Sequence, residues 1–179
     1  MASVGFIELL RLADLAKART TGRHDNDTHQ WTGIAFEVAG QKLVAPMGEI
    51  SEILALPDVV PIPLTKPWLM GVANVRGRLL PLVDFAKFLG LQSHERLKNR
   101  KVLVIDEEGI FSGILVDQVL GILQFSESHY QARAINEDSP FAPYNHGVFV
   151  KDNKEWFVMM PSLLCASADY LNAAAVKLS

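Results

Sequence analysis

Residues 68–85 read WLMGVANVRGRLLPLVDF, and this segment concentrates residue types that have geometric roles. Gly71 and Gly77 permit a close approach of the backbone or a positive φ. Asn74 is suited to satisfying nearby backbone groups in a turn. Arg76 lies among apolar residues, where an unpaired charge would be expensive, so we expect a carboxylate or several carbonyls beside it. The segment therefore predicts a turn that holds an anchored arginine.

The second half of this segment predicts a strand followed by a short helix. Residues 79–85 are mostly apolar, and Pro81 interrupts the strand because proline has no N–H to donate to a ladder. Asp84 is placed to cap the N-terminus of a helix over residues 84–89, and Gly90 is placed to end it.

Outside this segment the sequence is dominated by short strands. Alternating or continuous apolar runs, separated by turn residues, predict about nine strands and little helix between them. These runs are 32–38, 43–45, 50–54, 79–85, 101–106, 110–116, 119–125, 147–150 and 156–160. The pattern favours antiparallel barrels over a doubly wound sheet. We therefore expect a mostly β protein of two small barrels, divided near residues 90–100.

The two ends of the chain carry the predicted helices. Residues 4–18 form an amphipathic pattern, followed by a polar linker up to residue 30. Its apolar face contains Phe6, Leu9, Leu10, Ala13 and Ala16. We expect this helix to cover an apolar patch of the main body or to engage a partner. Pro161 opens a C-terminal helix to about Leu171, and residues 172–179 form a tail. The long polar segment 126–144 is expected on the surface.

Composition excludes several classes of protein. Of the 179 residues, 49% are hydrophobic and 21% charged, which is typical of a globular chain rather than a disordered one. The formal charge of −3 gives no reason to expect nucleic-acid binding. The single cysteine, Cys165, excludes an internal disulfide and fits a reducing compartment. With no signal peptide and no apolar run long enough to span a bilayer, we expect a cytoplasmic protein without direct membrane insertion.

Signatures of catalysis are missing from the sequence. There is no phosphate-binding loop, no nucleophile elbow and no histidine pair with metal-ligand spacing. Cys165 lies in an apolar helical setting, which predicts a buried, inert thiol. The basic residues of segment 96–101 are expected in a solvated loop. We expect no catalytic residue, metal or cofactor, although a small β-barrel enzyme and a nucleic-acid-binding barrel remain as alternatives.

Three motifs in order resemble the CheW-like domains, the coupling proteins of bacterial chemotaxis arrays. The first is the Gly–Asn–Arg–Gly–Pro–Asp block of the opening segment, with Gly71, Asn74, Arg76, Gly77, Pro81 and Asp84. The others are Gly48-Glu-Ile-Ser-Glu-Ile53 and Gly113-Ile-Leu-Val-Asp117-Gln-Val119. The resemblance covers about residues 31–171. The sequence around Pro46 and Gly71 looks most like the branch of this family that serves type IV pilus (twitching) motility.

The resemblance implies two packed, five-stranded SH3-like barrels and a non-catalytic adaptor. Its partners would be the cytoplasmic tip of a methyl-accepting chemoreceptor and the regulatory domain of a CheA-like histidine kinase, within a membrane-associated receptor array. An apolar groove between the barrels would accept the receptor helices.

We expect this groove to be lined by strand residues on both sides of the predicted division. The candidates are Ile50, Glu52, Ile53, Arg76, Ile114, Val116 and Val119. For each apolar member, plain core packing is an equally good interpretation. Glu52 and Arg76 are expected to form a partly buried ion pair beside the receptor site. Gly71, Asn74, Gly77, Pro81, Asp84 and Asp117 are expected to maintain the structure.

Overall fold

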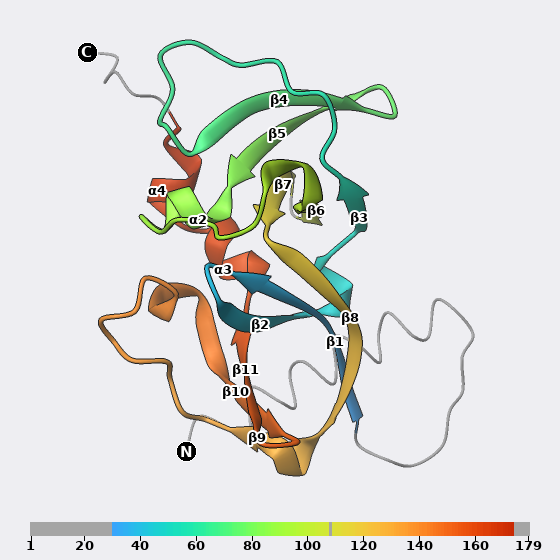
Figure 1. The fold of residues 1–179 in the computed structure, drawn as a ribbon, viewed down its shortest axis with the longest axis vertical. Coiled ribbons are helices and arrows are strands. Elements are labelled where there is room, and N and C mark those ends of the chain that lie inside the picture. The colour runs from blue at the N-terminus through green and yellow to red at the C-terminus, as the bar shows by residue number, and fades with distance from the viewer. Residues whose placement is uncertain (1–29, 108, 174–179) are drawn as a thin grey trace.

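The computed structural model describes residues 30–107 and 109–173, which form two curled β-sheets stacked along the long axis of the molecule (Figure 1). The first sheet has six strands in the order β8-β1-β2-β11-β10-β9, and the second has five in the order β3-β6-β7-β5-β4. The mostly β, two-barrel architecture is therefore confirmed, with one strand more than expected in the first sheet. The predicted N-terminal helix and most of the linker and tail lie outside the described residues.

The bounds of the elements follow the chain. The first sheet contains β1 (Gln30–Val38), β2 (Gln41–Pro46), β8 (Gln118–Ser126), β9 (Tyr130–Gln131), β10 (Asn145–Lys151) and β11 (Lys154–Met159). The second contains β3 (Glu52–Ala55), β4 (Leu69–Val75), β5 (Arg78–Asp84), β6 (Lys101–Glu107) and β7 (Ile110–Val116). The short helices are α2 (Phe85–Phe88), α3 (Pro161–Cys165) and α4 (Ala168–Leu171), with 3-10 turns η1 (Met47–Glu49), η2 (Leu97–Asn99), η3 (Glu127–His129) and η4 (Ala142–Tyr144).

The expected division near residues 90–100 does not separate the two sheets. The second sheet is inserted as a block between β2 and β8, and residues 90–100 connect β5 to β6 inside it. The first sheet is completed only when β8 returns to pair with β1, where Trp31 lies opposite Phe125. The division is misplaced because local sequence patterns do not report such a long-range pairing.

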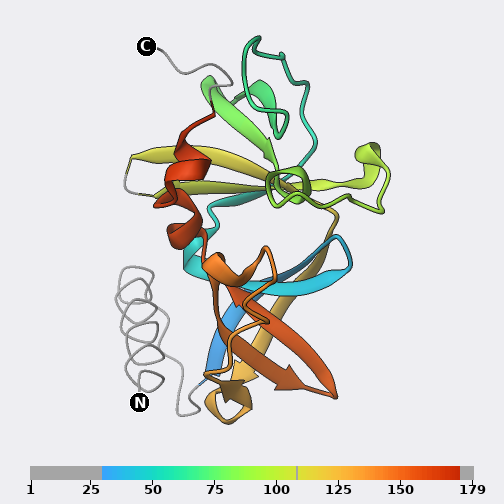
Figure 2. The same ribbon diagram turned by 90° about the vertical axis from the view of Figure 1, so that its left-hand side faces the viewer.

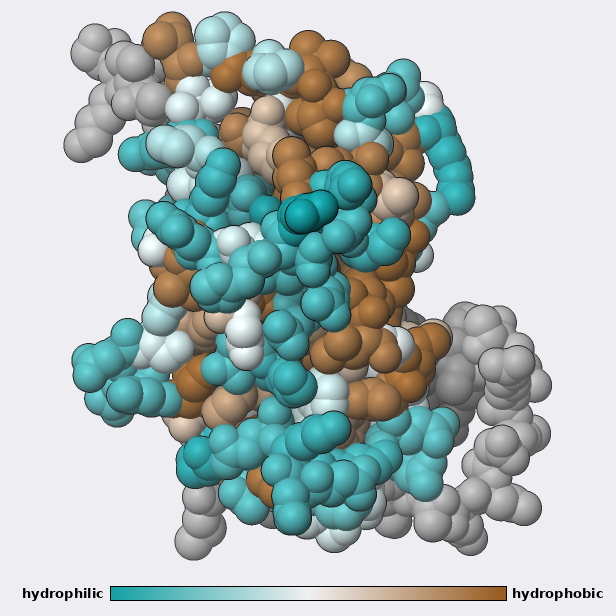
Figure 3. Space-filling view, in the orientation of Figure 1, coloured by the Kyte–Doolittle hydropathy of each residue, from teal (hydrophilic) through white to brown (hydrophobic). Residues whose placement is uncertain are grey.

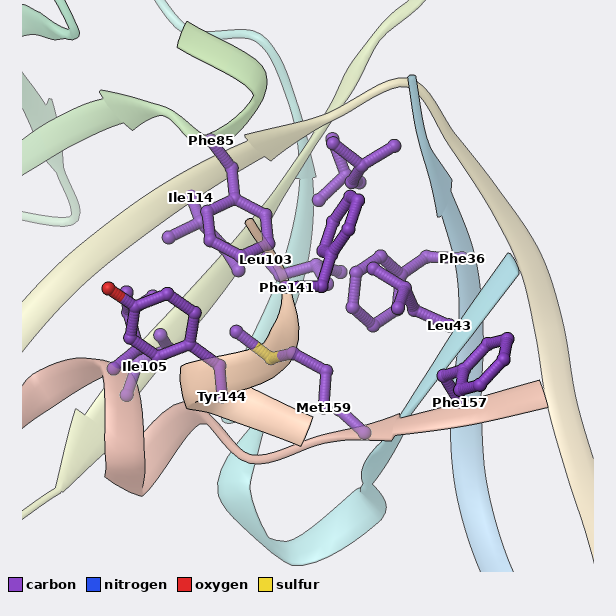
Figure 4. Packing of buried hydrophobic residues seen from close by; sticks show 14 of the residues in the cluster. Phe36, Leu43, Phe85, Leu103, Ile105, Ile114, Phe141, Tyr144, Phe157 and Met159 are labelled. Atoms are coloured by element: carbon purple, nitrogen blue, oxygen red, sulfur yellow. The ribbon is translucent and has the colours of Figure 1, made fainter. Parts of the chain in front are cut away.

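One hydrophobic core joins the two sheets. Phe36 and Leu43 of the first sheet belong to the same buried cluster as Phe85 and Leu103 from the second-sheet side (Figure 4). All four side chains are almost completely buried. Burial on this scale stabilises each large side chain by about 1.5–3 kcal/mol, so the sheets form one packed unit.

The later part of the chain contributes to this core more than its sequence predicts. Phe141 and Tyr144, in the segment expected to be a surface connection, are buried in the shared cluster. The C-terminal helix is divided into α3 and α4, which Figure 2 shows on one side of the molecule, alongside both sheets. Pro161 occupies the first turn of α3, as predicted.

Candidate interaction surface

The turn between β4 and β5 has the geometry of a tight hairpin. Arg76 and Gly77 both have positive φ angles, 52° and 82°, as a type I′ turn requires. The Gly77 N–H donates to Asn74 Oδ1 at 2.9 Å, so Asn74 satisfies a backbone group as predicted. The left-handed conformation is unfavourable for a side chain such as that of Arg76. The hairpin therefore holds this arginine at its tip at some conformational cost.

Arg76 forms the ion pair that the sequence predicts. Its Nη2 donates to Glu52 Oε1 at 2.5 Å. The Arg76 side chain is 79% exposed, whereas that of Glu52 is 26% exposed. The expectation that Arg76 lies among apolar residues is thus wrong, because its position at the tip of the hairpin directs it to solvent. The pair joins β3 to the β4–β5 hairpin, from opposite edges of the five-stranded sheet, and so helps to close the barrel.

A second exposed arginine lies two residues further along the hairpin. Arg78 Nη1 donates to Asp106 Oδ2 at 2.6 Å, and the Arg78 guanidinium lies 3.6 Å from the centre of the Phe111 ring. The hydrogen bond from Arg78 lowers the pKa of the Asp106 carboxyl. Arg78 is therefore held by Asp106 of β6 and Phe111 of β7. Because it is also an exposed, ion-paired arginine of the same hairpin, it is a matched control for Arg76.

The predicted groove residues lie in different environments. Ile50, Ile114 and Val116 are buried in the shared core, where a partner helix cannot reach them unless the core opens. Val119 is partly buried and packs against the same cluster. Ile53 is 41% exposed and follows Glu52 on β3. We therefore restrict the candidate surface to Glu52, Ile53 and Arg76, here called the β3–turn surface. The sequence offered no sign that Leu79, just after the turn, is also exposed.

Gly71 is required by a close approach of two backbone segments. Its φ is 139°, and a Cβ at this position would lie 2.1 Å from the Val60 carbonyl oxygen. Val60 and Val72 exchange backbone hydrogen bonds of 2.8 and 3.0 Å. This contact attaches the proline-containing segment 56–68 to β4. Pro81, expected to interrupt β5, lies within it, and pairing of β5 with β7 begins only at Leu82.

Asp84 belongs to a buried charge network that the sequence does not reveal. Its Oδ1 accepts the N–H of Lys87 and so caps α2, as predicted. Its carboxylate also accepts two hydrogen bonds from Arg100, both 3.0 Å long. Arg100 Nε lies 3.3 Å from Asp117 Oδ1, and the Arg100 side chain is only 4% exposed. The placement of Arg100 in a solvated loop is wrong, because its partners are distant in sequence.

Asp117 extends this network to the other sheet. It lies at the junction of β7 and β8, and its carboxylate accepts the N–H of Ala39 at 2.8 Å. Ser93 Oγ donates to the same carboxylate at 2.6 Å. Because Ala39 belongs to the β1–β2 turn and Asp84 ends β5, the network Asp84–Arg100–Asp117 fastens the two sheets together. We call it the buried triad.

The described residues offer little for catalysis. Residues 30–107 and 109–173 contain no group of three or more His, Cys, Asp or Glu side chains that could hold a metal ion. A cavity of about 340 Å³ is lined by aromatic and apolar residues together with Lys66, Asp169 and Asn172. Burial, with smaller contributions from Glu107 and Glu49, raises the pKa of Cys165 to about 11, which disfavours the thiolate.

Comparison with known proteins identifies the family. The model of the CheW-like domain matches residues 32–168. The chain belongs to the CheW-like domain family. Protein PilI of Pseudomonas aeruginosa is 38% identical over 80% of each chain. Chemotaxis protein CheW of Thermotoga maritima is 31% identical, over 68% of this chain and 78% of that protein.

A solved structure supports the fold independently. The scaffolding protein TtCheW from Thermoanaerobacter tengcongensis superposes with a TM-score of 0.65 at 19% identity, covering 72% of this chain and 88% of that one. Members of the CheW-like family are non-catalytic scaffold proteins of chemotaxis-like systems, and this chain is one of them. Among the described residues, no helix is both long and apolar enough to cross a membrane.

Proposed function

We propose that this chain couples a methyl-accepting chemoreceptor to a CheA-like histidine kinase in the chemosensory pathway that controls type IV pilus twitching motility. The observation that carries the pilus assignment is the 38% identity to Protein PilI over four-fifths of both chains. The coupling role is what the CheW-like family implies, and the receptor tip and the kinase regulatory domain are the partners.

The β3–turn surface is suited to binding the helical hairpin of a receptor tip. Ile53 offers an exposed apolar contact on β3, and the preceding residue, Glu52, offers with Arg76 one charge of each sign. An amphipathic helix docks through apolar anchors, while charged neighbours fix its register. Such a contact is small, and small contacts suit an array in which many of them act together.

The buried triad supports the same function indirectly. It fixes the orientation of the two sheets, so that surfaces on each are held at a constant distance and angle. An adaptor that transmits a signal by repositioning two partners needs such a rigid body between them.

The experiment is affinity purification of the tagged full chain from an extract of its own bacterium. We expect a chemoreceptor and a histidine kinase to co-purify, together with components of the pilus pathway. Co-purification with flagellar chemotaxis proteins alone would contradict the pilus assignment. Recovery of neither a receptor nor a kinase would contradict the coupling role.

A further inference from the structure

The strand β8 presents an unusual edge to its surroundings. It lies at the end of the six-stranded sheet, and its nine residues, QVLGILQFS, include no charged residue and no proline. Two large apolar residues of the strand, Leu120 and Ile122, are 40% and 57% exposed. Figure 3 shows hydrophobic surface on this side of the molecule, in the region of β8 and upward toward β3.

Such an edge is a liability unless something covers it. An unpaired strand edge is a template for pairing with another chain, and natural proteins protect it with charges, prolines, bulges or a covering helix. The register between β1 and β8 shifts at Ala35 and Phe36, where β8 carries one extra residue, Leu120, and so contains a bulge. β8 has no charge and no proline to protect the rest of its edge. No strand within the described part of the chain pairs with its outer edge.

The chain itself supplies a segment of matching character. Residues 4–18 place Phe6, Leu9, Leu10, Ala13 and Ala16 on one helical face, with Arg11 on the opposite face. Such a helix must bury its apolar stripe against something. β8 has no charged residue, and the polar face of the predicted helix carries charges of both signs and would point away from β8. The two segments therefore do not repel each other electrostatically.

The point at which the described chain begins brings this segment close to β8. Gln30 is paired with Ser126, the last residue of β8. Leu120 lies six residues before Ser126, which corresponds to about 20 Å along a strand. The connection formed by residues 19–29 spans up to about 35 Å when extended, and a 15-residue helix is about 22 Å long. The helix is therefore able to lie along β8 without strain in the connection.

We propose that residues 4–18 form an amphipathic helix that packs its apolar face on Leu120 and Ile122 and covers the β8 edge of the same molecule. The segment protects the sheet from pairing with other chains. Any partner that binds at this edge must first displace it. The proposal does not depend on which receptor or kinase the chain serves.

Disulfide trapping in the full chain tests the contact directly. The variant Leu9→Cys with Ile122→Cys should form an intramolecular disulfide under mild oxidation, at least tenfold faster than Arg11→Cys with Ile122→Cys. Cys165 is buried and its thiolate is disfavoured, so it contributes little background. Equal trapping in the two variants, or trapping only between molecules, would overturn the proposal.

Hydrogen exchange provides a second, independent measurement. In the full chain, Leu9→Asp with Leu10→Asp should accelerate exchange of the β8 amides that face away from β1 at least tenfold, while Arg11→Asp leaves it unchanged. Exchange in the central strand β11 serves as the internal reference for global stability. Unchanged β8 exchange in the double variant would overturn the proposal. So would protection that disappears on dilution, because the occupant would then be a second copy.

Discussion

Two arginines of this protein face carboxylates in opposite environments. Arg100 is buried between Asp84 and Asp117, whereas Arg76 meets Glu52 at the tip of a hairpin with most of its side chain in water. The same chemical pair therefore serves two purposes. The buried arginine–carboxylate pair fastens the two sheets, and breaking it costs much stability. The exposed pair contributes little to stability and remains available to a partner.

The largest effect is expected at the buried triad. Replacing Arg100 by Met leaves two buried carboxylates without their cation, which should lower the free energy of unfolding by about 3–5 kcal/mol. Urea denaturation measures this change. Lys98→Met, in the same basic segment but exposed, should stay within about 0.5 kcal/mol of the wild type. Similar losses of unfolding free energy in both variants would show that burial does not distinguish Arg100 from Lys98.

A smaller loss of stability is expected from replacing the glycines of the β4–β5 hairpin, the hairpin that carries Arg76. Gly71→Ala places a methyl group against the Val60 carbonyl at a strained φ, and should cost about 2–3 kcal/mol. Gly77→Ala has open space around it and pays only for the left-handed backbone, about 1 kcal/mol. Thermal or urea unfolding compares the two. A greater loss for Gly77→Ala would contradict the close approach at Gly71.

The exposed pair should contribute least to stability. Arg76→Ala and Glu52→Ala are each expected to change the free energy of unfolding by less than about 1 kcal/mol, and the double variant should show a coupling in the same range. A double-mutant cycle in urea measures it. A coupling as large as that lost on removing Arg100 would mean that the pair is structural.

The burial of the Cys165 thiol can be tested by chemical labelling, without measuring a change in stability. With its pKa raised to about 11, chiefly by burial, the group is almost entirely protonated at pH 8, so a thiol reagent should label the native protein slowly and the urea-unfolded protein fast. The variant Ala166→Cys adds an exposed thiol one residue away, which should label fast in the native protein. Equally fast labelling of both thiols would contradict the packing of α3.

What the sequence predicted well are features whose cause is local. The cap at Asp84, the end of α2 at Gly90 and the turn at Asn74 depend on residues a few positions apart. The Glu52–Arg76 pair was also expected, although it is not local and one of its premises, that Arg76 lies among apolar residues, is wrong.

The missed features all depend on distant parts of the chain. Nothing beside Arg100 in the sequence indicates burial, because its neighbours are polar and its carboxylate partners come from other elements. The insertion of the second sheet between β2 and β8 is equally invisible, as is the burial of Phe141 within a polar connection. Local patterns report the strands, but the pairing of β8 with β1 decides which strands share a sheet.

The most direct test of the central claim is the affinity of a receptor cytoplasmic-tip fragment for three forms of this protein, measured by titration calorimetry. We expect Arg76→Ala to weaken binding at least tenfold, about 1.4 kcal/mol, while Arg78→Ala changes it less than twofold and both variants remain folded. Equal affinities for the two variants would contradict the assignment of the β3–turn surface as the receptor site.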